Sequence, residues 1–157
     1  MRLVIIADDF TGALDVSVQF APYDVIIKIA MGQSVDESAF TRGDADVLVV
    51  DAETRHLSAG AADAAVRRLV AMAVAADTQV IYLKTDSGLR GNVGATLTAA
   101  LLESDRSVLA FAPAFPDMHR PTLGGVQYNE GVPIHLSPFG QDPFEPVRTS
   151  NVAELFK

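Results

Sequence analysis

The sequence predicts an α/β domain in which a mainly parallel β-sheet is flanked by helices, with a C-terminal β-hairpin and a Pro-rich loop. As far as Ala112, short apolar runs alternate with amphipathic segments, a pattern typical of parallel strands joined by helical crossovers. After Pro113 this alternation stops, and prolines and glycines become frequent. The 157 residues are 49% hydrophobic and 20% charged, which is the composition of a globular chain long enough to bury a core. We therefore expect a single domain over residues 1–157.

The first strand and the first helix are predicted at the N-terminus. Met1–Ala7 is an apolar run that stops at two aspartates, as expected for a strand buried on both faces. Thr11–Ala21 carries Leu14 and Val18 at helical spacing, and Pro22 ends the segment.

Two further strands and the longest helix follow. Asp24–Ala30 and Asp46–Val50 are apolar runs rich in isoleucine and valine, and the stretch between them, Met31–Asp44, is polar and irregular. Ser58 is a favourable N-cap residue for an alanine-rich helix that ends near Ala76.

The predicted sheet is completed by two strands that enclose a helix. Gln79–Leu83 predicts a fourth strand, and Ser107–Ala112 predicts a fifth. Between them, Asn92 can cap a helix that ends near Glu103.

Beyond the sheet, the segment GVQYNEGVPIHL has the pattern of a β-hairpin. Gly125–Tyr128 and Val132–Leu136 are its predicted strands, and Asn129–Gly131 is its predicted turn. Ser137–Val147 is a loop interrupted by prolines. The last residues, Asn151–Lys157, begin a helical pattern that stops, from which we expect a second domain to be missing from this chain.

Charge and composition exclude several classes of protein. Twelve basic and twenty acidic residues give a net charge of −8, which disfavours broad contact with nucleic acid or an anionic membrane but allows a small basic pocket. The chain has no cysteine, so it has no disulfide, thiolate nucleophile or cysteine-based zinc site. No apolar run approaches the about 18–20 residues of a membrane helix, and the N-terminus does not resemble a signal peptide. We expect a soluble, cytoplasmic protein.

Polar motifs recur where the predicted strands end. Such motifs follow strands one, three, four and five, beginning at Asp8, Asp51, Lys84 and Pro113. In open parallel sheets, ligands bind beyond the carboxyl ends of the strands. We therefore expect these loops to share one edge of the sheet and to form a common pocket there.

The pair Asp8-Asp9 offers two carboxylates at this edge. A carboxylate there can accept a proton from a substrate hydroxyl as a general base, or it can cap the helix that begins near Thr11. Side chains alternate along an extended chain, so the two acids are not expected to face the same pocket. A hydrolase that forms an aspartyl phosphate would favour Asp-x-Asp over two adjacent aspartates.

The stretch from Lys84 to Asn92 combines two cations, two hydroxyls, a carboxylate and two glycines. Arg90 can hold a carboxylate or phosphate through two parallel hydrogen bonds, and the following helix N-terminus favours an anion. The sequence predicts an anion-binding loop, with an internal Asp86–Arg90 pair as the alternative. Neither the GxGxxG fingerprint nor the P-loop pattern occurs in the chain.

Other polar residues are assigned weaker roles. Asp51 and Arg55 extend the same edge, and Arg120 is a candidate second anion contact. Isolated histidines such as His56 and His135 are expected to be structural or exposed. No spacing of His, Asp and Glu resembles a structural metal site, so no metal ligand is assigned.

Five ordered motifs resemble the N-terminal domain of the four-carbon acid sugar kinase family. These motifs are ADDFTGALD, VVDAETRHLS, LKTDSGLRGN, FAPAFP and GGVQYNEGVPIHLSPFGQDPF, and they span nearly the whole chain. The resemblance implies a two-domain enzyme that phosphorylates D-threonate, D-erythronate or an oxo-tetronate with ATP and Mg²⁺. This chain would be the sugar-acid-binding domain, the C-terminal ATP-binding domain would be absent, and the chain alone would bind no cofactor and be inactive.

The resemblance and the residues together assign a site. Asp9 is the catalytic candidate that orients or deprotonates the accepting hydroxyl, and Arg90 with Lys84 is the candidate for the carboxylate. The full set of substrate-binding candidates is Asp8, Asp51, Arg55, Lys84, Asp86, Ser87, Arg90, Gly91 and Asn92. The expected partner is a small sugar acid, with a homodimer possible and no nucleic acid or membrane.

The chain departs from the family pattern at two positions, and two other functions stay open. The family usually has threonine where this chain has Gly88, and small residues are common at the position of His119. One rival function is a stand-alone module that binds a small anion without catalysis. The other is a Mg²⁺-dependent phosphatase that uses the Asp8-Asp9 pair.

Overall fold

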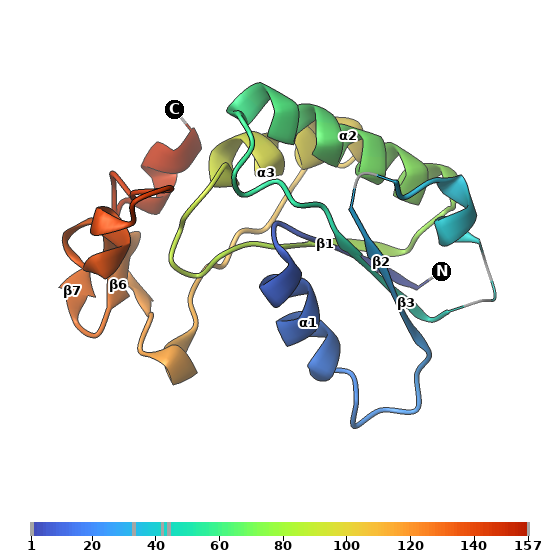
Figure 1. The fold of residues 1–157 in the computed structure, drawn as a ribbon, viewed down its shortest axis with the longest axis horizontal. Helices are drawn as coiled ribbons and strands as arrows, with labels where there is room; N and C mark the ends of the chain where they lie inside the picture. The colour runs from blue at the N-terminus through green and yellow to red at the C-terminus, as the bar shows by residue number, and fades with distance from the viewer. Residues whose placement is uncertain (1, 33, 42, 44, 157) are drawn as a thin grey trace.

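Four parallel strands form the centre of the fold and lie in the order β2-β3-β1-β4. The computed structural model describes residues 2–32, 34–41, 43 and 45–156, and the remaining parts of the predicted segments Met1–Ala7, Met31–Asp44 and Asn151–Lys157 lie outside it. The strands are β1 (Leu3–Ala7), β2 (Ile27–Met31), β3 (Val47–Asp51) and β4 (Val80–Lys84). Helices α2 (Ala59–Ala75) and α3 (Val93–Glu103) cover one face of this sheet, and α1 (Phe10–Val18) covers the other (Figure 1). The predicted fold class is confirmed.

The two faces of the sheet carry separate parts of the core, because side chains alternate along each strand. Val4 and Ile6 pack with α2 and α3, whereas Ile5 and Ala7 pack with Ala13 of α1. All of β3 is buried, as expected for an inner strand with helices on both sides.

The carboxyl ends of three strands are level with one another. Ala7 at the end of β1 lies opposite both Asp51 of β3 and Lys84 of β4. The loops that follow β1, β3 and β4 therefore start at one edge of the sheet, which we call the rim. Figure 1 shows the C-terminal part of the chain, in orange and red, beyond this end of the sheet.

The starts of α2 and α3 agree with the sequence, and the start of α1 differs by one residue. The Ser58 hydroxyl caps α2 as predicted, by accepting a hydrogen bond from the Ala61 N–H at 3.3 Å. Helix α1 begins one residue before the predicted start, because Asp9 is its N-cap and accepts from the Gly12 N–H at 2.7 Å. Asn92 precedes α3, but its side chain makes no capping bond.

The apolar pattern that predicted α1 does not mark its buried face. Leu14 and Val18 are 42% and 61% exposed, while the small residues Gly12, Ala13 and Ser17 are buried. Small side chains let the helix approach the sheet closely, so the residues in contact were not the most hydrophobic ones. The predicted helix also extends too far, because α1 ends at Val18 and not at Ala21.

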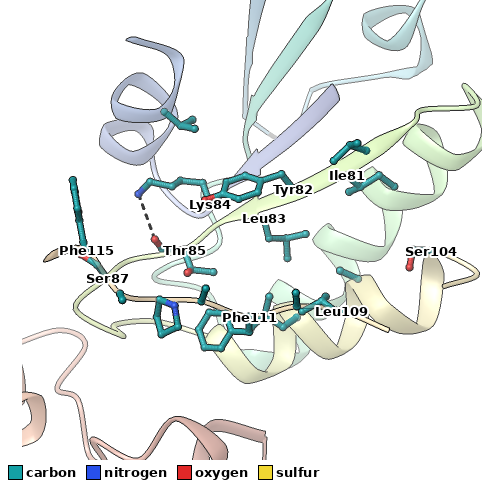
Figure 2. Close-up of a pocket in the computed structure, with 18 of the residues that line it drawn as sticks. Ile81, Tyr82, Leu83, Lys84, Thr85, Ser87, Ser104, Leu109, Phe111 and Phe115 are labelled. Atoms are coloured by element: carbon teal, nitrogen blue, oxygen red, sulfur yellow. Dashed lines mark hydrogen bonds between the residues drawn. The ribbon is translucent and has the colours of Figure 1, made fainter. Parts of the chain in front are cut away.

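The predicted fifth strand, Ser107–Ala112, is wrong. Among the residues that the structure describes, this segment forms no ladder with β4, and β4 pairs with β1 alone. Between β4 and residues 108–115 lies a trough of about 760 Å³, with β4 on one side and Leu109 and Phe111 on the other (Figure 2). An apolar sequence alone does not make a strand, because the strand also needs a partner edge within hydrogen-bonding distance.

The open edge of β4 predicts a specific pattern of hydrogen exchange. The Val80 N–H donates to the Arg2 carbonyl at 3.1 Å and the Lys84 carbonyl accepts from Asp8 at 3.2 Å, so alternate residues of β4 face β1. The amides of Ile81 and Leu83 then point into the trough, and we expect them to exchange faster than the Tyr82 amide when measured by NMR. Equal protection of all three amides would mean that residues 107–112 do pair with β4 in solution.

The C-terminal part contains the predicted hairpin, with a shorter second strand and an additional strand before it. The antiparallel strands are β5 (Thr122–Leu123), β6 (Val126–Asn129) and β7 (Val132–Pro133). Short 3₁₀ helices occupy Glu37–Phe40, Pro116–Met118, Ile134–Leu136, Pro138–Gln141 and Val152–Phe156. None of the described helices has the length and apolar character to cross a lipid bilayer.

Candidate functional site

Backbone hydrogen bonds join the three loops at the rim. The carbonyl of Asp8, just after β1, accepts from the N–H groups of Thr54 and Arg55 at 3.0 and 3.1 Å. The Asp8 N–H donates to Lys84, at the end of β4, at 3.2 Å. The loops after β1, β3 and β4 are therefore held side by side.

Arg55 holds both aspartates of the first loop. Its Nε and Nη2 groups donate to the two carboxylate oxygens of Asp8, each at 3.0 Å, and its Nη1 group donates to Asp9. The expectation that the two acids face different ways is wrong, because Asp9 has already left the strand as the N-cap of α1. One carboxylate oxygen of Asp9 caps the helix while the other meets Arg55.

Burial and hydrogen bonding have opposite effects on the pKa values of Asp8 and Arg55. Desolvation raises the pKa of Asp8 above its ordinary value, although Arg55 opposes the shift. Burial also acts to lower the pKa of Arg55, but its bonds to Asp8 outweigh burial and the pKa is raised. Arg55 is therefore a fixed cation that binds two carboxylates, and its charge is already neutralised by them.

Asp51 is a fully buried carboxylate at the end of β3. Its Oδ1 accepts from the Glu53 N–H at 3.1 Å, and its Oδ2 has no hydrogen-bond partner among the described residues. Desolvation raises the pKa of Asp51 above its ordinary value. Asp51 lies behind the rim, without the exposure that a direct ligand contact needs.

The loop from Lys84 to Asn92 contains the internal ion pair that the sequence left as an alternative. Arg90 Nε donates to Asp86 Oδ2 at 2.6 Å, and Arg90 Nη1 donates to Asp142 at 3.4 Å. Burial acts to raise the pKa of Asp86, but the Arg90 bonds prevail and the pKa is lowered. The hydrogen bond to Asp86 raises the pKa of Arg90. Arg90 thus binds two carboxylates of its own chain.

Asn92 and Gly91 fix this loop against the loop after β3. The Asn92 Nδ2 group donates to the carbonyls of Thr54 at 3.0 Å and Leu57 at 2.8 Å. Gly91 has a φ of +77°, and a side chain there would meet the Arg55 backbone at 3.1 Å. Both residues therefore position Arg55 and make no contact that identifies them as ligand groups.

The Phe139 ring lies against Gly88. A Cβ atom at Gly88 would lie 2.4 Å from the Phe139 ring, so the ring occupies the space of a side chain. The guanidinium carbons of Arg120 and Arg90 lie 4.8 and 5.1 Å from the ring centroid. The glycine thus allows one aromatic ring to contact two arginines.

Arg120 reaches the rim from the segment after Phe115. Its Nη1 donates to the Ser87 hydroxyl at 2.9 Å and its Nε donates to the Asn129 side-chain oxygen at 3.3 Å. Phe115 and Arg120 form an isolated antiparallel bridge. Arg120 therefore joins the loop after β4 to the hairpin.

Gln127 is a buried residue of the site that the sequence analysis did not single out. Its Nε2 group donates to the carbonyls of Ser87 at 2.9 Å, Arg120 at 3.3 Å and Pro113 at 3.4 Å, and its oxygen accepts from Thr122. The available signal was a polar side chain within a short strand, which also fits an exposed position. Phe139 and Asp142 were missed because nothing local indicates that they fold back onto Ser87 and Arg90.

Lys84 occupies the boundary between the rim and the trough. Its Nζ donates to the Thr85 carbonyl at 3.3 Å and lies 3.7 Å from Asp15 (Figure 2). In the described part of the chain, no group of three or more His, Cys, Asp and Glu side chains could hold a metal ion. His56 is exposed and lies 3.4 Å from Glu145, while His135 hydrogen-bonds Ser150 at 2.6 Å.

Comparisons with known proteins give one consistent family. Residues 3–157 match the family model described as a sugar-binding N-terminal domain. The chain is 36% identical over 156 residues to a D-threonate kinase of Salmonella typhimurium, covering 99% of this chain and 36% of that protein. It is 31% identical over 159 residues to a D-erythronate kinase of Heliobacterium modesticaldum, covering 98% of this chain and 35% of that protein.

A solved structure agrees with the fold. The crystal structure of a Bordetella bronchiseptica protein, a domain-swapped dimer with bound citrate, is 34% identical with a TM-score of 0.92. The match covers 99% of this chain and 39% of that one. The chain therefore spans little more than a third of the length of the relatives that it matches.

Proposed function

The chain belongs to the sugar-binding N-terminal domain family, and from this premise we propose that it binds a four-carbon sugar acid at the rim, as the substrate-binding part of an ATP-dependent kinase. One observation carries the proposal: the loops after β1, β3 and β4 bring acids, hydroxyls and arginines together at one edge of the sheet. A sugar acid presents one carboxylate and several hydroxyls, which suit a cation and a set of carboxylate and hydroxyl groups.

Asp9 is the proposed partner of the hydroxyl that accepts the phosphoryl group. Its carboxylate is the more exposed of the two that Arg55 holds. A carboxylate that is held in place can orient a hydroxyl and accept its proton as the new bond forms. In an enzyme that contains this domain, Asp9→Asn would keep an N-cap acceptor for α1 but lose the base, so kcat is expected to fall more than KM changes.

ATP and Mg²⁺ are proposed to bind to a further part of the enzyme. The relatives named as kinases are nearly three times as long as the match. The described residues hold no cluster fit for a metal ion, so no step of this proposal is routed through a metal held by this chain. A homodimer is also proposed, with the domain-swapped relative as its support.

The phosphatase alternative has no support from these findings. The relatives are named as kinases. A stand-alone anion-binding module differs from the kinase proposal only in whether a nucleotide-binding part belongs to the same enzyme.

Calorimetric titration of the chain with D-threonate and D-erythronate, each with and without Mg–ATP, tests the proposal. We expect saturable binding of at least one sugar acid that does not change when the nucleotide is present. Asp24→Asn serves as a control, since Asp24 is exposed and precedes β2, at the amino ends of the parallel strands and not at the rim. No binding of either acid, or binding that Asp24→Asn weakens, would contradict the proposed site.

A further inference from the structure

The arginines at the rim differ in what neutralises them. Arg55 is bonded to two carboxylates, those of Asp8 and Asp9, and Arg90 is bonded to those of Asp86 and Asp142. Each of these clusters holds one positive and two negative charges. An incoming carboxylate would meet net negative charge at both of them.

Among the described residues, the side chain of Arg120 has only neutral hydrogen-bond partners. Its two side-chain hydrogen bonds go to the Ser87 hydroxyl and the Asn129 amide oxygen, and no carboxylate of the described residues forms an ion pair with it. A guanidinium has five N–H groups, and those of Nη2 have no partner in the described part of the chain. Arg120 thus retains both its charge and the donors that can bind a carboxylate in a planar pair.

The Arg120 guanidinium is already held in position. The Phe139 ring lies 4.8 Å below its central carbon, and the Phe115–Arg120 bridge fixes its backbone through bonds of 2.8 and 3.1 Å. The buried Gln127 donates to the backbone carbonyls of both Arg120 and Ser87, so the backbones of these two residues are linked through one amide. A side chain fixed in this way loses little conformational freedom when it binds a ligand.

From this arrangement we propose that Arg120, and not Arg90 or Arg55, binds the carboxylate of the sugar acid and makes the site select acids over the neutral polyol. The inference rests on the proposed function, because it concerns the same site. It identifies Arg120 as the residue that determines specificity for the acid group, and it leaves Arg55 and Arg90 as residues that position the surrounding loops.

Paired titrations of the chain with D-threonate and with threitol, its uncharged counterpart, test the inference. Arg120→Met keeps an unbranched side chain but removes the guanidinium and its charge. We expect this variant to bind D-threonate about 10- to 100-fold more weakly, the loss typical of a hydrogen-bonded charge, with threitol binding unchanged. Arg120→Lys should recover part of the affinity because it restores the charge without the planar fork.

Arg148→Ala is the matched control, because Arg148 is an exposed arginine of the same C-terminal part. It should bind D-threonate as the unmodified chain does. If Arg120→Met binds D-threonate normally, or loses D-threonate and threitol equally, the inference is overturned while the proposed function stands. If the unmodified chain binds no sugar acid, the proposed function fails and the inference fails with it.

Discussion

Replacing Arg55 with alanine is expected to lower the free energy of unfolding by about 3–5 kcal/mol, which is the cost of removing one partner of a buried ion pair. The Arg55 side chain is 12% exposed, and its removal leaves the carboxylates of Asp8 and Asp9 close together without a cation. Domains of this size are stable by about 5–15 kcal/mol, so the loss is a large share of the total. Urea unfolding at neutral pH measures it.

A matched variant separates this effect from the loss of any ion pair. Arg67 also lies near two acids, Asp63 and Glu103, but on the surface of the molecule, so Arg67→Ala is expected to cost far less. Adding Asp8→Asn and Asp9→Asn to Arg55→Ala should recover part of the stability, because the unpaired charges are removed. A cost for Arg55→Ala no larger than that for Arg67→Ala would show that Arg55 does not organise the rim.

Asp86→Asn is expected to destabilise the domain by about 1.5–3 kcal/mol at neutral pH, the value of a hydrogen bond to a charged group. Asp86 is buried, and its pKa is lowered from 3.8 because Arg90 outweighs the effect of burial. A lowered pKa contributes stability above the unfolded value, and that contribution is lost as the pH falls through the folded value. The difference in free energy of unfolding between the unmodified chain and Asp86→Asn should therefore become smaller in acid.

Comparing the unmodified chain with Asp86→Asn separates the contribution of Asp86 to the pH dependence of stability from those of its neighbours. The raised pKa values of Asp8 and Asp51 have the opposite sign, since these carboxyls bind protons more readily in the folded state and gain stability in acid. The Asp51 contribution is common to both proteins and cancels in the difference, and the Asp8 contribution changes little because Asp86 is the weakest of the causes that act on its pKa. Unfolding in urea at neutral pH and at about pH 3 supplies the comparison. A difference that is the same at both pH values would contradict the assigned ion pair.

The central strands and the second helix could be predicted because their signals are local. Residues 47–50 of β3 are all apolar and the whole strand is buried, and Ser58 caps its helix as its chemistry suggests. Residues 107–112 carry a similar apolar signal, but no strand edge lies within reach of them. Strand formation therefore depends on a neighbour that the local sequence does not specify.

The location of the candidate site could be predicted from the sequence, but the contacts within it could not. Parallel strands bring their carboxyl ends to one edge, which placed Asp8, Asp86 and Arg90 near one another. Which carboxylate each arginine binds was not predictable, because Asp142 and Phe139 are distant in sequence from Arg90. That Arg120 is available to bind a ligand can be inferred only once the carboxylate partners of Arg55 and Arg90 are known.

The most direct test of the central claim, that the rim binds the sugar acid, is amide chemical-shift mapping of the chain during titration with D-threonate. We predict the largest changes in the loops at the carboxyl ends of the strands, at Asp9, Ser87 and Arg120. Changes concentrated at the opposite end of the sheet, around Asp46 and Gln79, or in the part of the trough between Ile81 and Leu109, away from Ser87, would place the ligand elsewhere and contradict the account.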